Sequence, residues 1–328
     1  MWSNGSTMKE RRDLPIGEID ERDSFFRISF GKDLSSLETS LALSGLLAPL
    51  ILREKEGGYQ VICGFRRLEA LRHLGQERVW ALIYSPEELP DQKGIVRAVA
   101  HNIPGGMNLV EKAQAVTKLK TCGLMEEEIV SRWLPALGFQ PHKRIYTKLR
   151  GIAQLPEGIR TYIAEQGLSL STASLFSLFG EEGLSALIPL LSSLRPGENK
   201  TKEILTHLHE IALREGTSVT ALLEEARGLW AGDDGRAERL ERFRDWLRRR
   251  RYPRFSTLKE EFEKFRASLR LPPSFSLHPP PFFEGEEFRV ELRFSDREQL
   301  MELSQGLRRL LESLQEEEDP LRRFKGLP

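Results

Sequence analysis

Residues 59–75, Tyr-Gln-Val-Ile-Cys-Gly-Phe-Arg-Arg-Leu-Glu-Ala-Leu-Arg-His-Leu-Gly, change their hydrophobic period in the middle. The run from Tyr59 to Cys63 is rich in residues that favour a strand, and it follows the turn pair Gly57-Gly58. After Gly64 the leucines recur at helical spacing, and Gly75 is placed to end a helix in a left-handed cap. The stretch therefore predicts a strand, a turn at Gly64 and a helix that opens on two arginines.

The turn has features that suit an anion. Gly64 has no side chain, so another molecule can approach its backbone, and the helix that follows offers free N–H groups and a positive dipole end. Arg66 and Arg67 add planar donors that suit phosphate oxygens. We call Gly64, Arg66 and Arg67 the cradle and predict that it holds a nucleotide phosphate. The alternative is an ordinary strand-turn-helix with two solvated arginines.

Residues 64–70, Gly-Phe-Arg-Arg-Leu-Glu-Ala, resemble the Gly-(Glu/His)-Arg-Arg-x-x-Ala box of the ParB partition proteins. The resemblance continues in the same order through residues 44–53 upstream and 75–83 downstream, and runs on to about Phe179, roughly half the chain. It implies an α+β fold that begins with a small mixed-sheet, ParB/sulfiredoxin-like domain. It also implies a bound CTP, with nucleotide-binding residues Gly45, Pro49, Gly64, Phe65, Arg66, Arg67 and Asn102.

A second family box, Glu-Asn-x-x-Arg, corresponds here to residues 101–108, His-Asn-Ile-Pro-Gly-Gly-Met-Asn. In the family the Glu and Asn lie near the metal and the triphosphate. Asn102 is kept, but His101 replaces the Glu and Gly105 replaces the Arg. Mg²⁺ prefers hard oxygen ligands, so these changes argue against metal-assisted CTP hydrolysis and leave the metal ligands unknown. The alternative role of Asn102 is to cap a helix end.

The segments around the cradle predict alternating strands and helices. Ser24–Phe30, Leu50–Arg53 and Val79–Tyr84 are predicted strands, and Pro86 is predicted to start a helix that carries Asn102. Strands that alternate with short helices imply a small mixed sheet whose site lies at a strand-to-helix turn. We predict a nucleotide-binding domain at residues 24–106, preceded by a flexible arm at residues 1–23.

Residues 107–230 are predicted to form a helical, DNA-binding domain. Met107–Ala113 resembles the family's Leu-Asn-Pro-x-Glu-x-Ala segment, and helices at Glu126–Leu134 and His142–Arg150 flank a turn that contains Gly138, as in a helix-turn-helix. A solvated basic face on a core helix is the alternative. The predicted DNA contacts of this domain are Lys143, Arg144, Tyr146, Thr147, Lys148 and Arg150, with Ser171 and Thr172 where the family has Gly and His.

Residues 231–273 form a basic segment. Its helix from Arg236 to Arg254 contains the run Arg248, Arg249, Arg250 and Arg251, with Leu240, Phe243 and Leu247 on one face. Contact with the DNA backbone, a partner surface and a solvated face over a helical core are the three interpretations. We favour the first, which would make DNA binding strongly salt-dependent.

Residues 274–328 are predicted to contain a linker and a short strand-helix dimerisation module. Glu287–Phe294 alternates apolar and charged residues, and a leucine-rich helix follows Asp296. One strand and one helix need a partner, either a second copy, as the family resemblance implies, or the rest of the same chain. The acidic run Glu316–Asp319 is expected to be disordered.

Composition fits a folded protein with two or three domains. The chain has 328 residues, a formal net charge of +0, 39% hydrophobic and 30% charged residues, and two cysteines. Two cysteines without metal-site spacing predict buried thiols in a reducing cytoplasm. No stretch is apolar enough to span a bilayer, so no membrane association is expected. Because the global charge is zero, any binding to nucleic acid would depend on local basic patches.

Together these features predict a ParB-like, dimeric protein that binds double-stranded DNA, is gated by CTP, associates with the nucleoid or a plasmid in partition, and has a ParA-like ATPase as partner. One alternative is a nucleotide-independent transcriptional regulator with a vestigial pocket. The other is a phosphate-handling or thiol enzyme on the same fold. Sulfiredoxins place their cysteine beside the His-Arg pair, whereas Cys63 lies ahead of Gly64, and this displacement argues against thiol chemistry.

Overall fold

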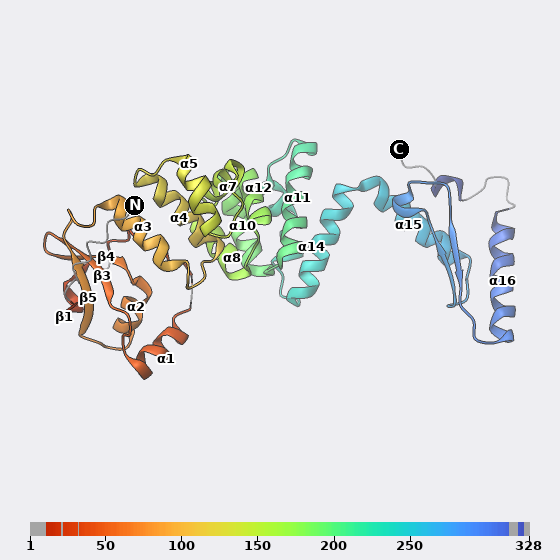
Figure 1. Ribbon diagram of the computed structural model, residues 1–328. Coiled ribbons are helices and arrows are strands. Elements are labelled where there is room, and N and C mark those ends of the chain that lie inside the picture. Colours follow the sequence, from red (N-terminus) through yellow and green to blue (C-terminus); the bar gives the residue numbers. More distant parts are fainter. Residues whose placement is uncertain (1–10, 21, 32, 315–320, 325–328) are drawn as a thin grey trace. The chain divides into compact units, whose positions relative to one another are not determined.

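The computed structural model describes residues 11–20, 22–31, 33–314 and 321–324 (Figure 1). The chain divides into two compact units. The first comprises Met1–His209 with Ser218–Glu224, and the second comprises Glu210–Thr217 with Glu225–Pro328. No helix within the described residues is long and apolar enough to cross a membrane.

The first unit begins with a five-stranded mixed sheet in the order β1-β5-β3-β4-β2. Strand β1 pairs antiparallel with β5, β5 runs parallel to β3, β3 pairs antiparallel with β4, and β2 runs parallel to β4. The strands are β1 (Arg11–Pro15), β2 (Ile19–Asp20), β3 (Leu50–Lys55), β4 (Gly58–Cys63) and β5 (Arg78–Tyr84). The predicted mixed sheet is therefore confirmed.

Alternation along the strands builds the core of this sheet domain. Leu50, Leu52 and Val61 are fully buried and belong to one apolar cluster with the leucines of α1 (Ser35–Ser44) and α2 (Phe65–His73). Because successive side chains of a strand point to opposite faces, Ile62 faces away from that cluster. Helix α3 (Asp91–Asn102) contacts β4 and begins at Asp91, five residues later than the predicted start at Pro86.

The N-terminal edge of the sheet corrects two predictions. Residues 11–20, predicted to be part of a flexible arm, form β1 and β2, because Leu14, Ile16 and Ile19 are buried in the sheet core. Both strands are short, and β1 is mostly charged on its exposed face, so their sequence lacks a clear strand signal. Residues 1–10 and 21 of the predicted arm lie outside the described residues.

Ser24–Phe30, predicted to be a strand, does not join the sheet. Its backbone groups bind side chains of the next domain instead: Lys118 Nζ donates to the carbonyl oxygens of Ser24 and Phe25 at 2.7 Å each. The Phe30 N–H donates to Glu111 Oε1 at 3.1 Å, and its carbonyl oxygen accepts from Asn108 Nδ2 at 3.0 Å. The apolar side chains that suggested a strand are buried instead: Phe26 and Ile28 are 1% exposed, and the Phe26 ring lies against Gly94 of α3 and the Arg53 guanidinium.

The remainder of the first unit is helical, as predicted. Helix α4 follows an Asn108–Glu111 capping box, and Gly138, at φ 83°, lies in the turn before α7. The segment before that turn contains a π-helical stretch at Ile129–Trp133 between α5 and α6. The helices are α4 (Leu109–Thr121), α5 (Glu126–Glu128), α6 (Leu134–Ala136), α7 (Lys143–Ala153), α8 (Glu157–Gln166), α9 (Leu170–Ala173), α10 (Glu181–Leu194), α11 (Glu198–Glu215) and α12 (Val219–Glu225). The end of α11 from Glu210 on, and Glu225 of α12, belong to the second unit.

The second unit contains α13 (Arg227–Trp230), α14 (Arg236–Arg251), α15 (Pro253–Ser268) and α16 (Arg297–Ser313), with a two-stranded sheet of β6 (Phe275–His278) and β7 (Arg289–Leu292). Strand β6 lies in the predicted linker, where Phe275 and Leu277 are buried. Leu303 and Leu310 of α16 pack in one cluster with Phe262 and Phe265 of α15, so the module packs on its own chain, as the alternative interpretation predicted. The predicted disordered run 316–319 lies outside the described residues.

Candidate nucleotide and DNA interfaces

Gly64 is required by the geometry of the cradle turn. It has φ 110° and stands at the N-cap of α2, directly after β4. A Cβ atom there would lie 2.5 Å from Leu50 Cδ2 and 3.1 Å from Arg67 Nη2. The first N–H groups of α2 follow at this point, as a helix N-terminus does at anion sites. The predicted strand, glycine turn and helix are thus confirmed.

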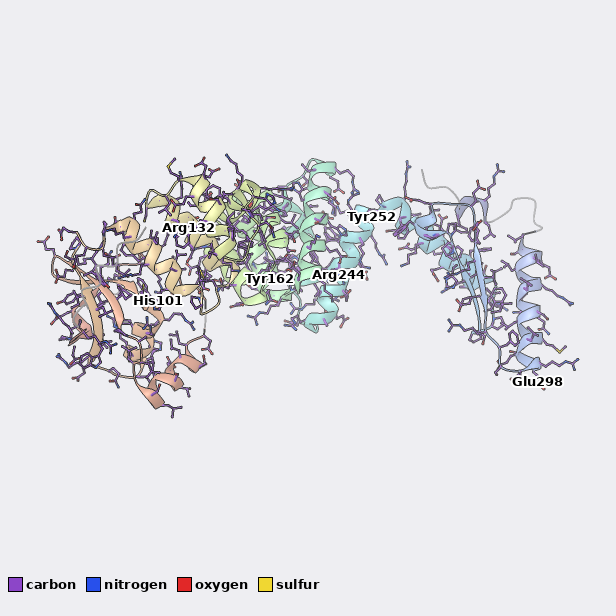
Figure 2. The ribbon with its side chains drawn as sticks, in the orientation of Figure 1. His101, Arg132, Tyr162, Arg244, Tyr252 and Glu298 are labelled. Carbon is purple, nitrogen blue, oxygen red and sulfur yellow. The ribbon has the colours of Figure 1, made fainter. Side chains whose placement is uncertain are left out.

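Arg67 brings the separate segments of the predicted site together. Its Nη1 donates to the carbonyl oxygen of Ala48 and, at 3.1 Å, to that of Pro49. Its Nη2 lies 3.4 Å from Nε2 of His101. His101 lies at the end of α3 (Figure 2). Burial lowers the pKa of Arg67. Arg67 therefore joins the loop that contains Gly45 and Pro49 to the cradle and to the second box.

Arg66 has a donor without an acceptor. Its Nη2 donates to the carbonyl oxygen of Asp33 at 2.9 Å. Its Nε is shielded from solvent and has no hydrogen-bond partner among the described residues. A buried donor without an acceptor costs about 1–3 kcal/mol, which a bound phosphate oxygen would relieve. Phe65, also predicted as a nucleotide contact, packs partly buried against the sheet core.

His101 and Asn102 occupy the end of α3. Burial, and then the nearby charge of Arg67, lower the pKa of His101, so its imidazole is neutral near pH 7 and Nε2 can accept from Arg67. Asn102 Nδ2 donates to the carbonyl oxygen of Ala98, one turn back, at 2.8 Å. This contact supports the helix-end alternative for Asn102.

Neither a metal centre nor a thiol nucleophile is evident in the described part of the chain. It contains no group of three or more His, Cys, Asp or Glu side chains that could hold a metal ion. Cys63 is buried, and burial raises the pKa of its thiol to about 12. The thiolate is the reactive form, so at neutral pH Cys63 is inert and a thiol enzyme is disfavoured.

Helix α7 presents a basic face to solvent. Lys143, Arg144 and Thr147 are exposed, whereas Tyr146 is 3% exposed and packs inside. The prediction that Tyr146 contacts DNA is therefore wrong, because the helix uses that position for its core. Lys143 Nζ lies 3.0 Å from Glu126 Oε1, and that hydrogen bond raises the pKa of Lys143. Lys148 and Arg150 are partly buried at the edges of this face.

Thr172 is also misassigned as a DNA contact. It is 0% exposed, and its hydroxyl donates to Glu198 Oε1. Ser169 caps α9 and donates to the same carboxylate at 2.6 Å. Thr172 is therefore part of a buried cap, while Ser171 beside it is exposed.

The arginine run of α14 binds carboxylates of its own chain. Arg250 Nη2 lies 2.7 Å from Glu215 Oε2 and its Nη1 lies 2.5 Å from Glu225 Oε1, and Arg251 Nε lies 2.6 Å from Glu210 Oε2. Arg248 lies 3.0 Å from Asp245, and Arg249 lies 3.3 Å from Glu260. These pairs argue against the predicted DNA contacts of Arg250 and Arg251, whose guanidinium groups bind carboxylates of α11 and α12. The DNA contacts of Arg248 and Arg249 stay predictions.

Comparison with known proteins finds similarity to ParB-related proteins over part of the chain. The family model of the ParB N-terminal domain matches residues 3–103. The nucleoid occlusion protein of Halalkalibacterium halodurans is 28% identical over 205 residues, which cover 60% of this chain and 69% of that protein. The stage 0 sporulation protein J of Bacillus subtilis is 29% identical over 186 residues, 56% of this chain and 62% of that protein. Residues 3–103 are thus similar to a ParB N-terminal domain, and the similarity to ParB-related proteins extends into the helices that follow.

Solved ParB structures are similar over a comparable part of the chain. Caulobacter crescentus ParB complexed to the centromeric parS site has 20% identity and a TM-score of 0.32 over 60% of this chain and 98% of that one. The same protein complexed with CTP-gamma-S has 21% identity and a TM-score of 0.26, and the match covers 55% of this chain and 99% of that one.

Two side chains outside the predicted site connect the ParB-like domain to the helices. Glu111 is 2% exposed and accepts from the N–H groups of Asn108 and Phe30, and Lys118 binds the carbonyl oxygens of residues 24 and 25. The spacing Asn108-x-x-Glu111 before an apolar run is a capping-box signal that could have identified Glu111. The contacts to residues 24–30 are long-range and have no such signal.

Proposed function

We propose that this chain is a dimeric ParB-like protein that binds double-stranded DNA and is gated by a cytidine nucleotide. The nucleotide would lie against Gly64, Arg66 and the N-terminus of α2, with the Gly45–Pro49 loop and Asn102 beside it. The observation that carries the proposal is Arg66 Nε, a buried donor without an acceptor among the described residues, placed at a helix N-terminus where a phosphate is favoured.

Calorimetric titration with CTP tests this site. We expect saturable CTP binding, weaker or absent binding of ATP, GTP and UTP, and loss of CTP binding in Arg66→Ala. Arg78→Ala is a matched control, because Arg78 is a surface arginine of the same sheet that pairs with Asp13 at 2.7 Å. No binding of any nucleotide would refute the proposed site. Because His101 and Gly105 replace the family's Glu and Arg, we propose binding without efficient hydrolysis, and phosphate release should stay at background.

Site recognition on DNA would use the exposed face of α7. Lys143, Arg144 and Thr147 are available in its first turns, with Lys148 and Arg150 at the edges. In a helix-turn-helix the first turns of the second helix enter the major groove. Replacing Lys143 or Arg144 by alanine should weaken DNA binding and reduce the salt slope by about one unit for each phosphate that the side chain neutralises in the wild type.

Dimer contacts would use exposed apolar surface in each unit. Leu43 and Leu47, at the Gly45–Pro49 loop, are 84% and 81% exposed. We propose that they support nucleotide-dependent pairing of the N-terminal domains. On α16, Leu300, Leu307 and Leu311 form a second stripe that leaves Leu303 and Leu310 to the internal core. We propose that this stripe joins two copies; sedimentation should show a dimer that Leu307→Asp converts to monomer.

A nucleotide-independent regulator is the second candidate. Arg67 already donates to the carbonyl oxygens of Ala48 and Pro49 and lies close to a neutral His101, so part of the cradle is satisfied without a ligand. Unchanged DNA affinity with and without CTP would favour this candidate. Nucleoid or plasmid association and a ParA-like ATPase partner stay predictions of the family resemblance.

A further inference from the structure

A pocket separate from the cradle lies beside α3. It has a volume of about 690 Å³ and is bounded by β3 and β5, by α3, and by the π-helical stretch Ile129–Trp133. Figure 2 labels two residues of its wall, His101 on α3 and Arg132 on the π-helical stretch. The residues that line it include His101 but not Gly64, Arg66 or Arg67. Its size is within the usual range of small-molecule sites, roughly 300–1,000 Å³.

Two donors in this wall are buried without acceptors. Trp133 is 6% exposed, and its Nε1 is shielded from solvent without a hydrogen-bond partner among the described residues. Arg97 Nη1 is also shielded from solvent and has no hydrogen-bond partner among the described residues. Indole and guanidinium nitrogens can only donate, so what both groups lack is an acceptor. A carboxylate or a phosphate group offers such acceptor oxygens.

The charge of the pocket also favours an anion. Lys93, Arg97 and Arg132 line it, against Glu88 and Glu128. Glu128 lies 3.8 Å from Arg132, a long separation, and Glu88 accepts from the Ser85 N–H at 2.9 Å. The cations therefore exceed the carboxylates in the wall.

The shape of the wall adds an apolar requirement. The Arg97 guanidinium carbon lies 4.8 Å from the centre of the Tyr84 ring, which fixes the plane of its donors. Leu82, Val96 and Leu124 provide apolar surface in the same pocket. Trp133 ends the π-helical stretch, and such distortions of a helix are often found at functional sites.

We propose that this pocket binds a small organic anion, whose carboxylate or phosphate accepts from Arg97 and Trp133 and whose apolar body lies against Leu82, Val96 and Leu124. The ligand would contact both α3, which carries His101 and Asn102, and the helix that precedes the basic helix α7. The site is separate from the proposed CTP site and does not depend on it.

Indole N–H resonances of the full-length protein, labelled with ¹⁵N-tryptophan, test the site. The Trp133 signal is assigned by its loss in Trp133→Phe. Benzoate and phenyl phosphate are the probes, since they distinguish a carboxylate from a phosphate ligand, and benzyl alcohol is the neutral control. We expect at least one anion to shift the Trp133 signal downfield saturably, and benzyl alcohol to leave it in place.

Three variants complete the test. Arg97→Met should abolish the shift, Arg78→Met should keep it, and Val96→Trp, which fills the pocket without removing either donor, should abolish binding. Circular dichroism checks folding, and if Arg97→Met does not fold, Val96→Trp decides. The proposal is overturned if neither anion gives a saturable shift, if benzyl alcohol gives the same shift, or if a folded Arg97→Met or Val96→Trp variant responds like wild type.

Discussion

Replacing Gly64 by alanine should destabilise the sheet domain by about 3 kcal/mol. Its φ of 110° is unfavourable for an L-residue and costs about 1–2 kcal/mol. The new Cβ would lie 2.5 Å from Leu50 Cδ2, and Leu50 is 0% exposed, so it cannot move into solvent. Forcing a methyl group into a packed core adds about 1–3 kcal/mol.

Gly75→Ala is the matched control for this substitution. Gly75 has φ 69°, and a Cβ there would meet nothing within 4 Å, so only the backbone cost of about 1 kcal/mol applies. Urea unfolding followed by circular dichroism compares the two variants. Gly64→Ala should lower the unfolding free energy by about 2 kcal/mol more than Gly75→Ala. Equal losses in both variants would refute the packing explanation for Gly64.

Further variants test contacts within each of the two units. Glu111→Gln turns an amide donor toward the N–H of Asn108 or Phe30 and should cost about 2 kcal/mol in thermal unfolding. Burial lowers the pKa of Lys118 from 10.5 to about 8, so between these two pH values the unfolded chain binds more protons than the folded chain. The unfolding free energy of the wild type should therefore rise with pH from about 8 to 10.5, and Lys118→Met should lack that rise. Arg250→Met should lower the melting temperature of the second unit but leave DNA affinity unchanged; a selective loss of DNA binding would contradict its pairing with Glu215.

Local patterns predicted the parts of the fold that depend on local physics. The strand, turn and helix around Gly64 combine a change of hydrophobic period with a position that only glycine fills, and both are visible in the sequence. The leucine-rich helix after Asp296 also follows from a local signal, a capping residue before an apolar helical repeat. In the structure the Asp296 side chain caps α16 by accepting from the Gln299 N–H. The sequence left open whether α16 packs on its own chain or on a second copy, because periodicity does not show what covers the apolar face of a helix. In the structure this face packs against α15.

Long-range contacts decided the rest. Ser24–Phe30 has strand-like residues, but side chains of α4 and of its N-cap residue Asn108 bind its backbone from about eighty residues or more away. Tyr146 and Thr172 stand beside exposed neighbours in the sequence, and only the packed helices show that both are buried. Carboxylates in α11 and α12 bind arginines of α14, and charge composition alone cannot reveal such pairs.

The most direct test of nucleotide gating measures how fast the full-length protein leaves DNA. The DNA would be closed at both ends and contain the preferred site, and dissociation would be followed at raised salt with and without CTP. We predict that CTP slows dissociation of wild type and of Arg78→Ala, but not of Arg66→Ala. Equal dissociation rates with and without CTP in wild type would contradict nucleotide gating and favour a regulator whose cradle is structural.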